Sequence, residues 1–207
     1  PRNSFERVLQ GSGRRASAQF SALYLDQPLG RQLELIRLAL PSARRIAVVW
    51  GPDSQSQASN LRALASARGL ELMEASVANQ EPLFPSFKRV LEDADILLAL
   101  ADSYVYNSGS LQNILLTSIR EKVPLFAFSP AYVRAGALVA LYTTPAAIGQ
   151  QAGSIVRGVL AGKGLSPTPL YPFEFDVVVN AHVAHALGLN LDADALHTRL
   201  HQREAMP

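Results

Sequence analysis

The sequence has no cysteine among its 207 residues. Disulfide bonds, thiolate nucleophiles and cysteine-ligated zinc are therefore excluded. An absence of cysteine suits an oxidising compartment as well as a reducing one, so it does not tell where the protein works. Charged residues are also few, at 17% of the sequence, whereas hydrophobic residues make up 48%. This balance is typical of a globular protein that can bury a substantial core.

Long apolar runs and clusters of one charge are missing as well. No window holds the run of about eighteen apolar residues that a membrane-spanning helix needs. The first ten residues, PRNSFERVLQ, contain no apolar core of a signal peptide. The net charge is only +2, and the basic residues are scattered rather than gathered into a stripe with interleaved aromatic residues. We therefore expect no nucleic-acid partner.

Helix-like and strand-like segments alternate from residue 26 onward. Apolar residues at helical spacing predict the helices, and short apolar runs between them predict strands. The predicted strands span residues 46–50, 70–77, 96–100, 124–128 and 137–142. Such an alternation is typical of a parallel sheet with helices on both faces. We therefore predict an α/β fold with a doubly wound, five-stranded parallel sheet in the flavodoxin-like order 2-1-3-4-5.

The two ends of the sequence do not fit this sheet. Residues 1–21 are polar, and GSGRR within them is predicted to be a loop. Near the other end, FEFDVVV (173–179) alternates like a strand that must find a partner, and two short helices are predicted to follow it. We therefore divide the sequence into a crossover segment (1–21), an α/β lobe (22–165) and a return segment (166–207), with the ends belonging to a second unit that is mostly missing.

Polar residues follow the predicted strands directly. In a doubly wound sheet, ligands bind beyond the carboxyl ends of the strands. These ends are residues 51–57, 102–107, 129–132 and 143–144. The clearest case is LLALADSYVYNSG, where an apolar run stops at Asp102, whose carboxylate could bind a cation or an ammonium group. The sequence leaves open the alternative that Asp102 or Ser103 only caps the following helix.

Aromatic residues near the strand ends, Trp50, Tyr104 and Tyr106, are candidates for stacking on a ligand, with sealing of the core as the alternative. Signatures of catalysis are missing. GPDSQSQ lacks the GK[ST] ending of a P-loop, and no G-x-S-x-G nucleophile elbow is present. The four histidines form two helical pairs near the C-terminal end without a clearly placed acidic partner, which favours polar surface positions over a metal site. We expect no catalytic residue, no metal and no cofactor.

Five stretches carry a resemblance to a known family. They are QLELIRLALPSARRIAVVWGPDS, DADILLALADSYVYN, KVPLFAFSPAYVRAGALVAL, IGQQAGSIVRGVLAGKG and VVVNAHVAHALGLNL. By their order and spacing, the sequence resembles, from about residue 22 to 197, the substrate-binding proteins of ABC transporters with the periplasmic type I fold. This group includes binders of aromatic amino acids. The most specific elements are Val123-Pro124 leading to Gly136-Ala137-Leu138, and the closing Asn180…Ala184…Leu187-Gly188.

The resemblance implies two α/β lobes that close over a solute, with this sequence as the second lobe and the return into the first. It also implies that Asp102 faces the solute and meets an ammonium group, and that the tail helices lie near the first lobe. The sequence departs from the family at two places. Ser56 and Gln57 stand where the family usually has Asn-Ser, and Thr144 and Pro145 stand where many members have Asp-Tyr, so a ligand-facing carboxylate and phenol would be lost.

We therefore interpret the sequence as a non-catalytic solute-binding component of an ABC importer, located in the periplasm or tethered on the outer side of the membrane. The expected partners are a small-molecule solute, for which an amino-acid-like compound is a candidate, and an ABC permease. We expect Asp102 to recognise charge and Tyr104 to stack. Hydrogen bonds are expected from Ser54, Ser56, Gln57, Ser103, Ser129 and Thr144.

Two other interpretations stay open. The same lobe could be a ligand-sensing or protein-interaction domain without a role in transport. An enzyme on a flavodoxin-like sheet is the weakest alternative, because no acid–base or nucleophile set converges at the strand ends. Copies of an isolated lobe are also expected to associate weakly, through the cleft face or through the strand at 173–179.

Overall fold

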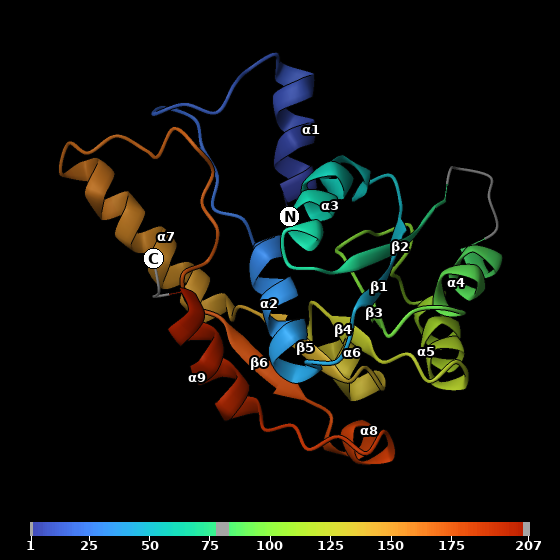
Figure 1. Cartoon of the computed structure of the whole chain (residues 1–207). Coiled ribbons are helices and arrows are strands. Elements are labelled where there is room, and N and C mark those ends of the chain that lie inside the picture. The colour runs from blue at the N-terminus through green and yellow to red at the C-terminus, as the bar shows by residue number, and fades with distance from the viewer. Residues whose placement is uncertain (1, 78–82, 205–207) are drawn as a thin grey trace. The chain divides into compact units, whose positions relative to one another are not determined.

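The computed structural model describes residues 2–77 and 83–204 (Figure 1). The outermost residues of the predicted crossover and return segments, 1 and 205–207, lie outside the described residues. The chain divides into two compact units. Unit 1 comprises Pro1–Pro28 and Tyr142–Asp176, and unit 2 comprises Leu29–Leu141 and Val177–Pro207. The boundaries predicted near residues 21 and 165 separate an α/β lobe from two segments that lead to another lobe, and they stay predictions.

A six-stranded sheet forms the centre of unit 2. Its strands are β1 (Arg45–Trp50), β2 (Glu71–Ser76), β3 (Ile96–Leu98), β4 (Leu125–Ala127), β5 (Val139–Tyr142) and β6 (Asp176–Val179). The sheet order is β2-β1-β3-β4-β5-β6, and the pairs from β2 to β5 are parallel. The predicted order 2-1-3-4-5 is thus confirmed. β6, which had no predicted partner, adds a sixth strand beside β5.

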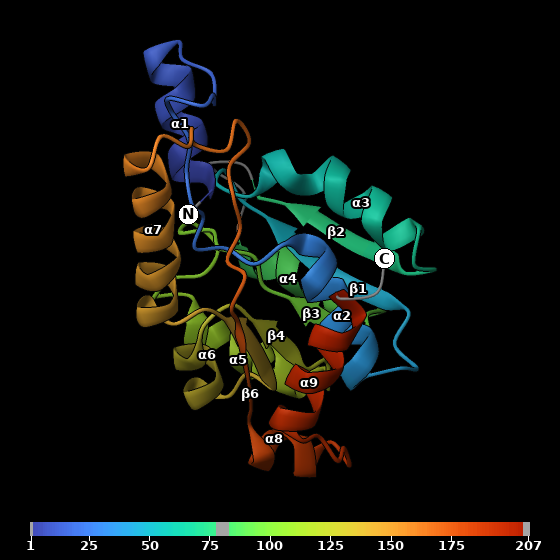
Figure 2. The same ribbon diagram turned by 90° about the vertical axis from the view of Figure 1, so that its left-hand side faces the viewer.

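Helices cover both faces of this sheet. They are α2 (Leu29–Ala39), α3 (Ala58–Ser66), α4 (Leu83–Leu91), α5 (Leu111–Arg120), α6 (Pro130–Ala135), α8 (Ala181–Ala186) and α9 (Ala193–Glu204), with the short 3-10 helix η1 (Gln55–Gln57). Figures 1 and 2 show α2, α3 and α9 on one face and α4, α5 and α6 on the other. Right-handed crossovers explain this division, because the chain changes direction across the sheet after β2.

The apolar strands are buried between these two helical layers. Successive strand residues point to opposite faces, so Ala47, Val49 and Leu97 share one core cluster with Phe87 of α4 and Ile114 of α5. The helices on the other face contribute the fully buried Leu33, Ile36, Leu61 and Leu200. Burial on both faces holds the strand ends, and hence the loops that follow them, in fixed positions.

The last helix, α9, packs against α2 within unit 2. Arg31 of α2 is buried, and its guanidinium donates to both carboxylate oxygens of Glu204, from Nε at 2.6 Å and from Nη2 at 2.9 Å. The resemblance implied that the tail helices lie near a first lobe. In the structure, α9 belongs to a helical layer of unit 2, where its buried Leu196 and Leu200 extend the core, and its position relative to a first lobe stays a prediction.

Unit 1 contains α1 (Arg2–Ser12) and α7 (Pro145–Leu160). The helix α1 corrects the sequence analysis, in which this polar segment was not predicted to be helical and GSGRR was predicted to be a loop. Phe5 and Leu9 stand one helical turn apart, and the Phe5 ring lies 5.5 Å from the ring of Phe20. The loop begins only at Gly13, whose φ of 64° suits glycine after a helix.

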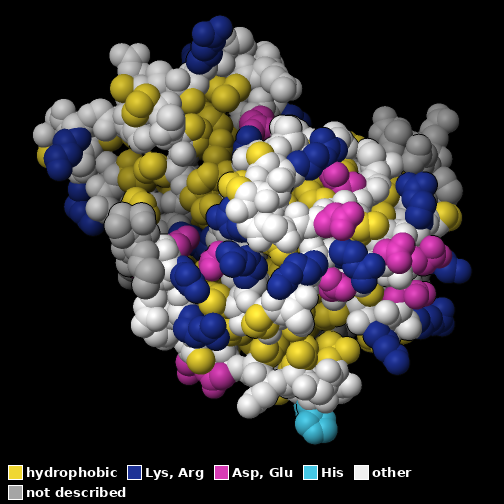
Figure 3. Space-filling model, viewed as in Figure 1, with side chains coloured by type: hydrophobic (Ala, Val, Ile, Leu, Met, Phe, Trp, Pro, Cys, Tyr) yellow, Lys and Arg dark blue, Asp and Glu magenta, His cyan; other side chains and the backbone are white. Residues whose placement is uncertain are grey.

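Unit 1 exposes several large hydrophobic side chains. Neither α1 nor α7 has a buried residue. Val156, Val159 and Leu160 of α7 are exposed, and Leu160 reaches 83%. Figure 3 shows hydrophobic side chains gathered on the surface of this unit. None of the helices in the described ranges has the length and hydrophobicity that a membrane crossing requires.

Asp95 joins the starts of β1 and β3. Its Oδ2 accepts hydrogen bonds from the backbone N–H groups of Arg44 at 2.7 Å and Arg45 at 2.8 Å, and its Oδ1 accepts one from Arg45 Nη2 at 3.2 Å. Partial burial raises the pKa of Asp95, but these hydrogen bonds outweigh that effect, so the pKa lies below its usual value. The charged carboxylate therefore stabilises the fold.

We expect Asp95→Asn to lower the free energy of unfolding by about 1 kcal/mol at pH 7. A carboxyl group whose pKa is lower in the folded state contributes stability above its unfolded-state pKa and loses it as the pH falls through the folded-state pKa. The deficit should therefore shrink below about pH 4. Urea unfolding at pH 7 and pH 3 measures it. Asp93→Asn is the control, because the Asp93 side chain is 72% exposed. Equal deficits at both pH values would contradict the prediction.

Candidate functional site

The Asp102 carboxylate connects the loops that follow β1 and β3. Its Oδ2 accepts hydrogen bonds from the backbone N–H groups of Asp53 and Ser54, both at 2.9 Å, and from the Ser54 hydroxyl at 2.8 Å. Its Oδ1 accepts from the backbone N–H groups of Tyr104 at 3.0 Å and Val105 at 3.3 Å. Asp102 is only 3% exposed. These five hydrogen bonds use the acceptor capacity of a carboxylate.

These contacts bear on the two interpretations that the sequence left open for Asp102. The bonds to Tyr104 and Val105 hold the turn that follows β3, whereas the following helix, α5, begins only at Leu111 with Ser110 as its N-cap, so Asp102 does not cap that helix. The bonds to the loop after β1 add a function that a cap alone does not have, because they fix two loops relative to each other. Direct contact between Asp102 and a solute stays a prediction.

Gly51 makes this arrangement possible. A Cβ atom at this position would lie 2.5 Å from both carboxylate oxygens of Asp102, far inside van der Waals contact. The backbone can pass the carboxylate this closely only where the residue has no side chain. The sequence analysis missed Gly51 as a residue that builds the site. The available signal was a glycine immediately after a buried strand, in VVWGPDS.

A second carboxylate ties the same two loops in the opposite direction. Asp53, in the loop after β1, accepts hydrogen bonds at its Oδ2 from the Ser103 hydroxyl at 2.7 Å and from the Ser103 backbone N–H at 3.3 Å. Ser54 is buried, whereas Ser103 is exposed. The structure thus brings the predicted Ser54, Asp102 and Ser103 together and adds Asp53, which the sequence analysis did not single out.

The other predicted polar residues lie on three further segments. Ser56 and Gln57 belong to η1, where Ser56 is exposed and Gln57 is half-buried. Ser129 caps α6, because its hydroxyl accepts a hydrogen bond from the backbone N–H of Ala131 at 3.3 Å. These residues all follow the carboxyl ends of strands in unit 2. Thr144 belongs to unit 1, where its hydroxyl caps α7.

Aromatic rings cluster beyond β3 and β4. The Tyr106 ring lies 6.1 Å from Phe87, 6.2 Å from Phe128 and 6.4 Å from Tyr132, while Phe128 and Tyr132 are 4.9 Å apart. Tyr106 is buried, whereas Phe128 and Tyr132 are half-buried. Tyr104 is 39% exposed. Of the tyrosines predicted at this edge, Tyr104 is therefore accessible and Tyr106 is part of the core.

Two buried aromatic side chains differ in how their polar atoms are satisfied. Trp50 is 1% exposed, and its Nε1 donates to Glu74 Oε1 at 2.6 Å. The Tyr106 hydroxyl has no hydrogen-bond partner in the described part of the chain. Burial, with smaller contributions from Tyr132 and Asp102, raises the pKa of this hydroxyl far above its usual value. Tyr106 therefore stays neutral and can act only as an uncharged donor or acceptor.

The fold and the site together define a class of protein. A doubly wound sheet whose carboxyl edge carries ordered polar loops is typical of α/β proteins that bind a ligand at this edge. The family model of ABC transporter substrate binding proteins matches residues 23–200. The chain belongs to this family, which confirms the resemblance seen in the sequence. Proteins of this family bind substrates without catalysing a reaction and typically work outside the cytoplasm.

Solved structures share the fold. A conserved domain protein from Vibrio cholerae is 26% identical, with a TM-score of 0.68, and the match covers 86% of this chain and 61% of that one. An ABC domain in complex with L-Trp from Streptococcus pneumonia is 20% identical, with a TM-score of 0.63, and the match covers 86% and 62%. A ligand-free, open substrate-binding protein with adhesive properties from Clostridium difficile is 21% identical, with a TM-score of 0.71, and the match covers 90% and 65%.

The matches differ in length from this chain, which spans 61–65% of these three structures. A search among curated proteins gives no match. Within the described residues, no group of three or more His, Cys, Asp or Glu side chains could hold a metal ion.

We expect Gly51→Ala to destabilise unit 2 by about 1–3 kcal/mol, because the new methyl group must push apart the loop and the Asp102 carboxylate. The control is Gly30→Ala in α2, where a Cβ atom would meet only Arg68 Nη2 at 3.4 Å and alanine favours the helix. Chemical denaturation of both variants makes the comparison. Equal stability of the two variants would show that the close approach at Gly51 has no energetic consequence.

Proposed function

We propose that this chain is the second lobe and return segment of the solute-binding component of an ABC importer, which binds a small, amino-acid-like solute between two lobes. The observation that carries the proposal is the pair of loops that Asp102 and Asp53 lock together at the carboxyl edge of the sheet. Loops that are already ordered lose little conformational entropy when a ligand binds, which favours affinity.

The charge of these loops supports a solute with an ammonium group. All five hydrogen bonds to Asp102 come from neutral backbone N–H groups or from the Ser54 hydroxyl. Within the part of the chain that the structure describes, these hydrogen bonds stabilise the negative charge and no cationic side chain pairs with it. Electrostatic attraction acts over several ångströms in a region of low dielectric constant, so Asp102 favours a nearby ammonium group even without direct contact.

The remaining predicted residues would contact the solute from this ordered edge. We propose hydrogen bonds from Ser56, Gln57, Ser103 and Ser129, whereas a contact from Thr144, which belongs to unit 1, stays a prediction. Exposed Tyr104 would provide a face for stacking, and the half-buried Phe128 and Tyr132 an apolar wall. Hinge closure between lobes would then enclose the solute. The proposed location is the periplasm or the outer side of the membrane, where an ABC permease receives the solute.

The apolar surface of unit 1 supports a first lobe. Of the large hydrophobic side chains that are exposed among the described residues, Val8, Leu25, Val156, Val159, Leu160 and Phe173 all belong to this unit. Val156, Val159 and Leu160 recur at helical spacing on α7, and an exposed apolar stripe of this kind often marks a surface that another element covers. We propose that a preceding lobe packs on α7, so that the segments 1–21 and 166–207 serve as crossover and return between two lobes.

The test is a calorimetric titration with the twenty amino acids, on this chain and on the longer protein that includes a first lobe. We expect Tyr104→Ala to weaken solute binding at least about fivefold in the longer protein, since an aromatic contact is worth about 1 kcal/mol or more. Leu116→Ala is the control, because Leu116 is 44% exposed on α5. Unchanged affinity of Tyr104→Ala would remove Tyr104 from the site.

Absence of binding by both proteins would instead favour the sensory or protein-interaction alternative. The genes next to this one separate the two functions. Adjacent permease and ATPase genes support transport, whereas an adjacent kinase gene supports sensing.

Without a first lobe, we expect copies of this chain to associate weakly at high concentration. Association was predicted through the cleft face or the strand at 173–179, and β6 is an edge strand of the sheet. The α7 surface is a third candidate.

Double replacement of Val156 and Leu160 by glutamine should lower the sedimentation-derived association constant at least fivefold if α7 mediates contact. Leu116→Gln is the control. A monomer at all concentrations would contradict the prediction, and association unaffected by the double variant would assign it to the other two surfaces.

A further inference from the structure

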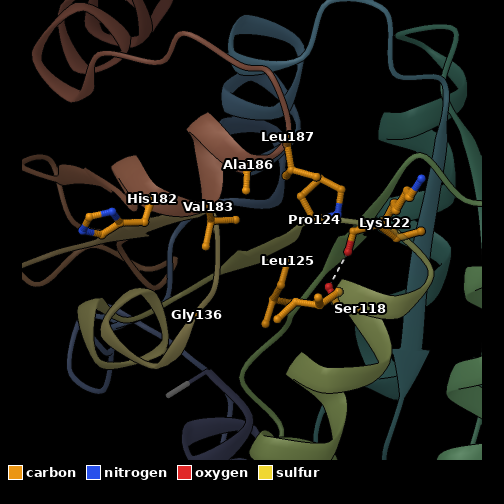
Figure 4. Close-up of a pocket in the computed structure, with 11 residues that line it drawn as sticks. Ser118, Lys122, Pro124, Leu125, Gly136, His182, Val183, Ala186 and Leu187 are labelled. Carbon is orange, nitrogen blue, oxygen red and sulfur yellow. Dashed lines mark hydrogen bonds between the residues drawn. The ribbon is translucent and has the colours of Figure 1, made fainter.

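Unit 2 has a hollow at the edge of the sheet opposite the candidate site. It lies where α5 ends, where β4 and β5 begin and where α8 packs beside them (Figure 4). Its volume is about 660 Å³, within the usual range for small-molecule sites. The solute-binding function proposed above does not use this hollow.

The floor of the hollow is apolar. Ile119, Leu125, Val183 and Leu187 contribute side chains to its lining, and Ile119 is 60% exposed. The Ser118 hydroxyl, which also lines the hollow, donates its hydrogen bond to the Val123 carbonyl, as the dashed line in Figure 4 marks. The floor therefore suits a hydrocarbon or aromatic group rather than a polar one.

Two basic side chains stand at the rim. Figure 4 shows Lys122 and His182 on opposite sides of the apolar floor. In the described ranges, the Lys122 ammonium makes no hydrogen bond or ion pair. The acidic residues nearby are Glu121, its neighbour in sequence, and Asp95, which lines an adjacent hollow together with Lys122. Asp95 is already bound to Arg45.

The backbone at Lys122 is unusual for this chain. Lys122 has a φ of 56°, and it is the only residue other than glycine with a positive φ among those described. It follows the C-cap of α5, a position where glycine is usual because a side chain is strained there. At the ends of α1, α3, α6, α7 and α8, this chain does place a glycine with positive φ. A lysine at the end of a helix also complements the helix dipole, so the test must separate this role from binding.

We propose that this hollow binds a small apolar carboxylate, with an aromatic or medium-chain aliphatic body on the floor and its carboxylate paired with Lys122. The site does not depend on the proposed transport function, because it uses neither the loops after β1 and β3 nor a first lobe. It would allow a second compound to bind this lobe independently of the solute.

The experiment titrates the isotope-labelled chain with 3-phenylpropionate and with octanoate, and follows backbone amide signals by NMR. Saturable shifts are expected at the end of α5, at the start of β4 and in α8, and not in residues 51–57 or 102–107. The uncharged 3-phenylpropionamide should bind at least fivefold more weakly, since it loses the charge-assisted contact. Shifts confined to the loops after β1 and β3, or none up to about 10 mM ligand, would overturn the proposal.

Lys122→Gly separates binding from a structural role. It removes the ammonium group and relieves the positive φ, so the melting temperature should stay the same or rise while 3-phenylpropionate affinity falls at least fivefold. Lys163→Gly, in the exposed segment after α7, is the control and should leave affinity unchanged. Equal affinity of Lys122→Gly and the parent protein would overturn the proposal. It would also be overturned if the same signals shifted with protein concentration alone, because a second copy would then occupy the hollow.

Discussion

The buried carboxylate of Asp102 is the interaction on which the candidate site depends. A carboxylate that leaves water loses a large solvation free energy, and the protein offsets this loss only when hydrogen bonds replace the lost water. Here five neutral donors from two loops do so. The loops after β1 and β3 therefore cannot separate without exposing an unsatisfied charge, and Gly51 must be a glycine to let the backbone approach.

The two edges of the same sheet differ in electrostatic character. At the carboxyl edge, Asp102 and Asp53 place negative charge beside exposed hydroxyl and phenol groups, which suits a cationic or zwitterionic solute. At the amino edge, Lys122 and His182 border an apolar hollow, which suits an apolar anion. The two edges are the opposite ends of the same strands, and these strands are buried on both faces. One lobe thus carries two chemically distinct surfaces on the same sheet.

Unit 1 has a different physical character from unit 2. Its helices α1 and α7 bury no residue, and aromatic contacts such as the edge-to-face pair of Tyr24 and Tyr171 hold its segments together. An apolar helix face of this kind gains most of its stability when another element covers it. This chain spans 61–65% of the three solved structures compared above.

The sequence by itself determined the fold class and the strand order. Apolar runs such as IAVVW and ILLAL can be buried only between two helical layers, and right-handed crossovers leave few ways to connect them. It did not reveal α1, because a polar composition obscured the spacing of Phe5 and Leu9, and it gave β6 no partner, because strand pairing is not local. The position of Asp102 was predictable from the end of an apolar run, but its partners were not. The hydrogen bonds from Asp53 and Ser54 join residues 49 and 48 positions apart, so only the tertiary structure, which brings β1 beside β3, decided that this carboxylate locks two loops together.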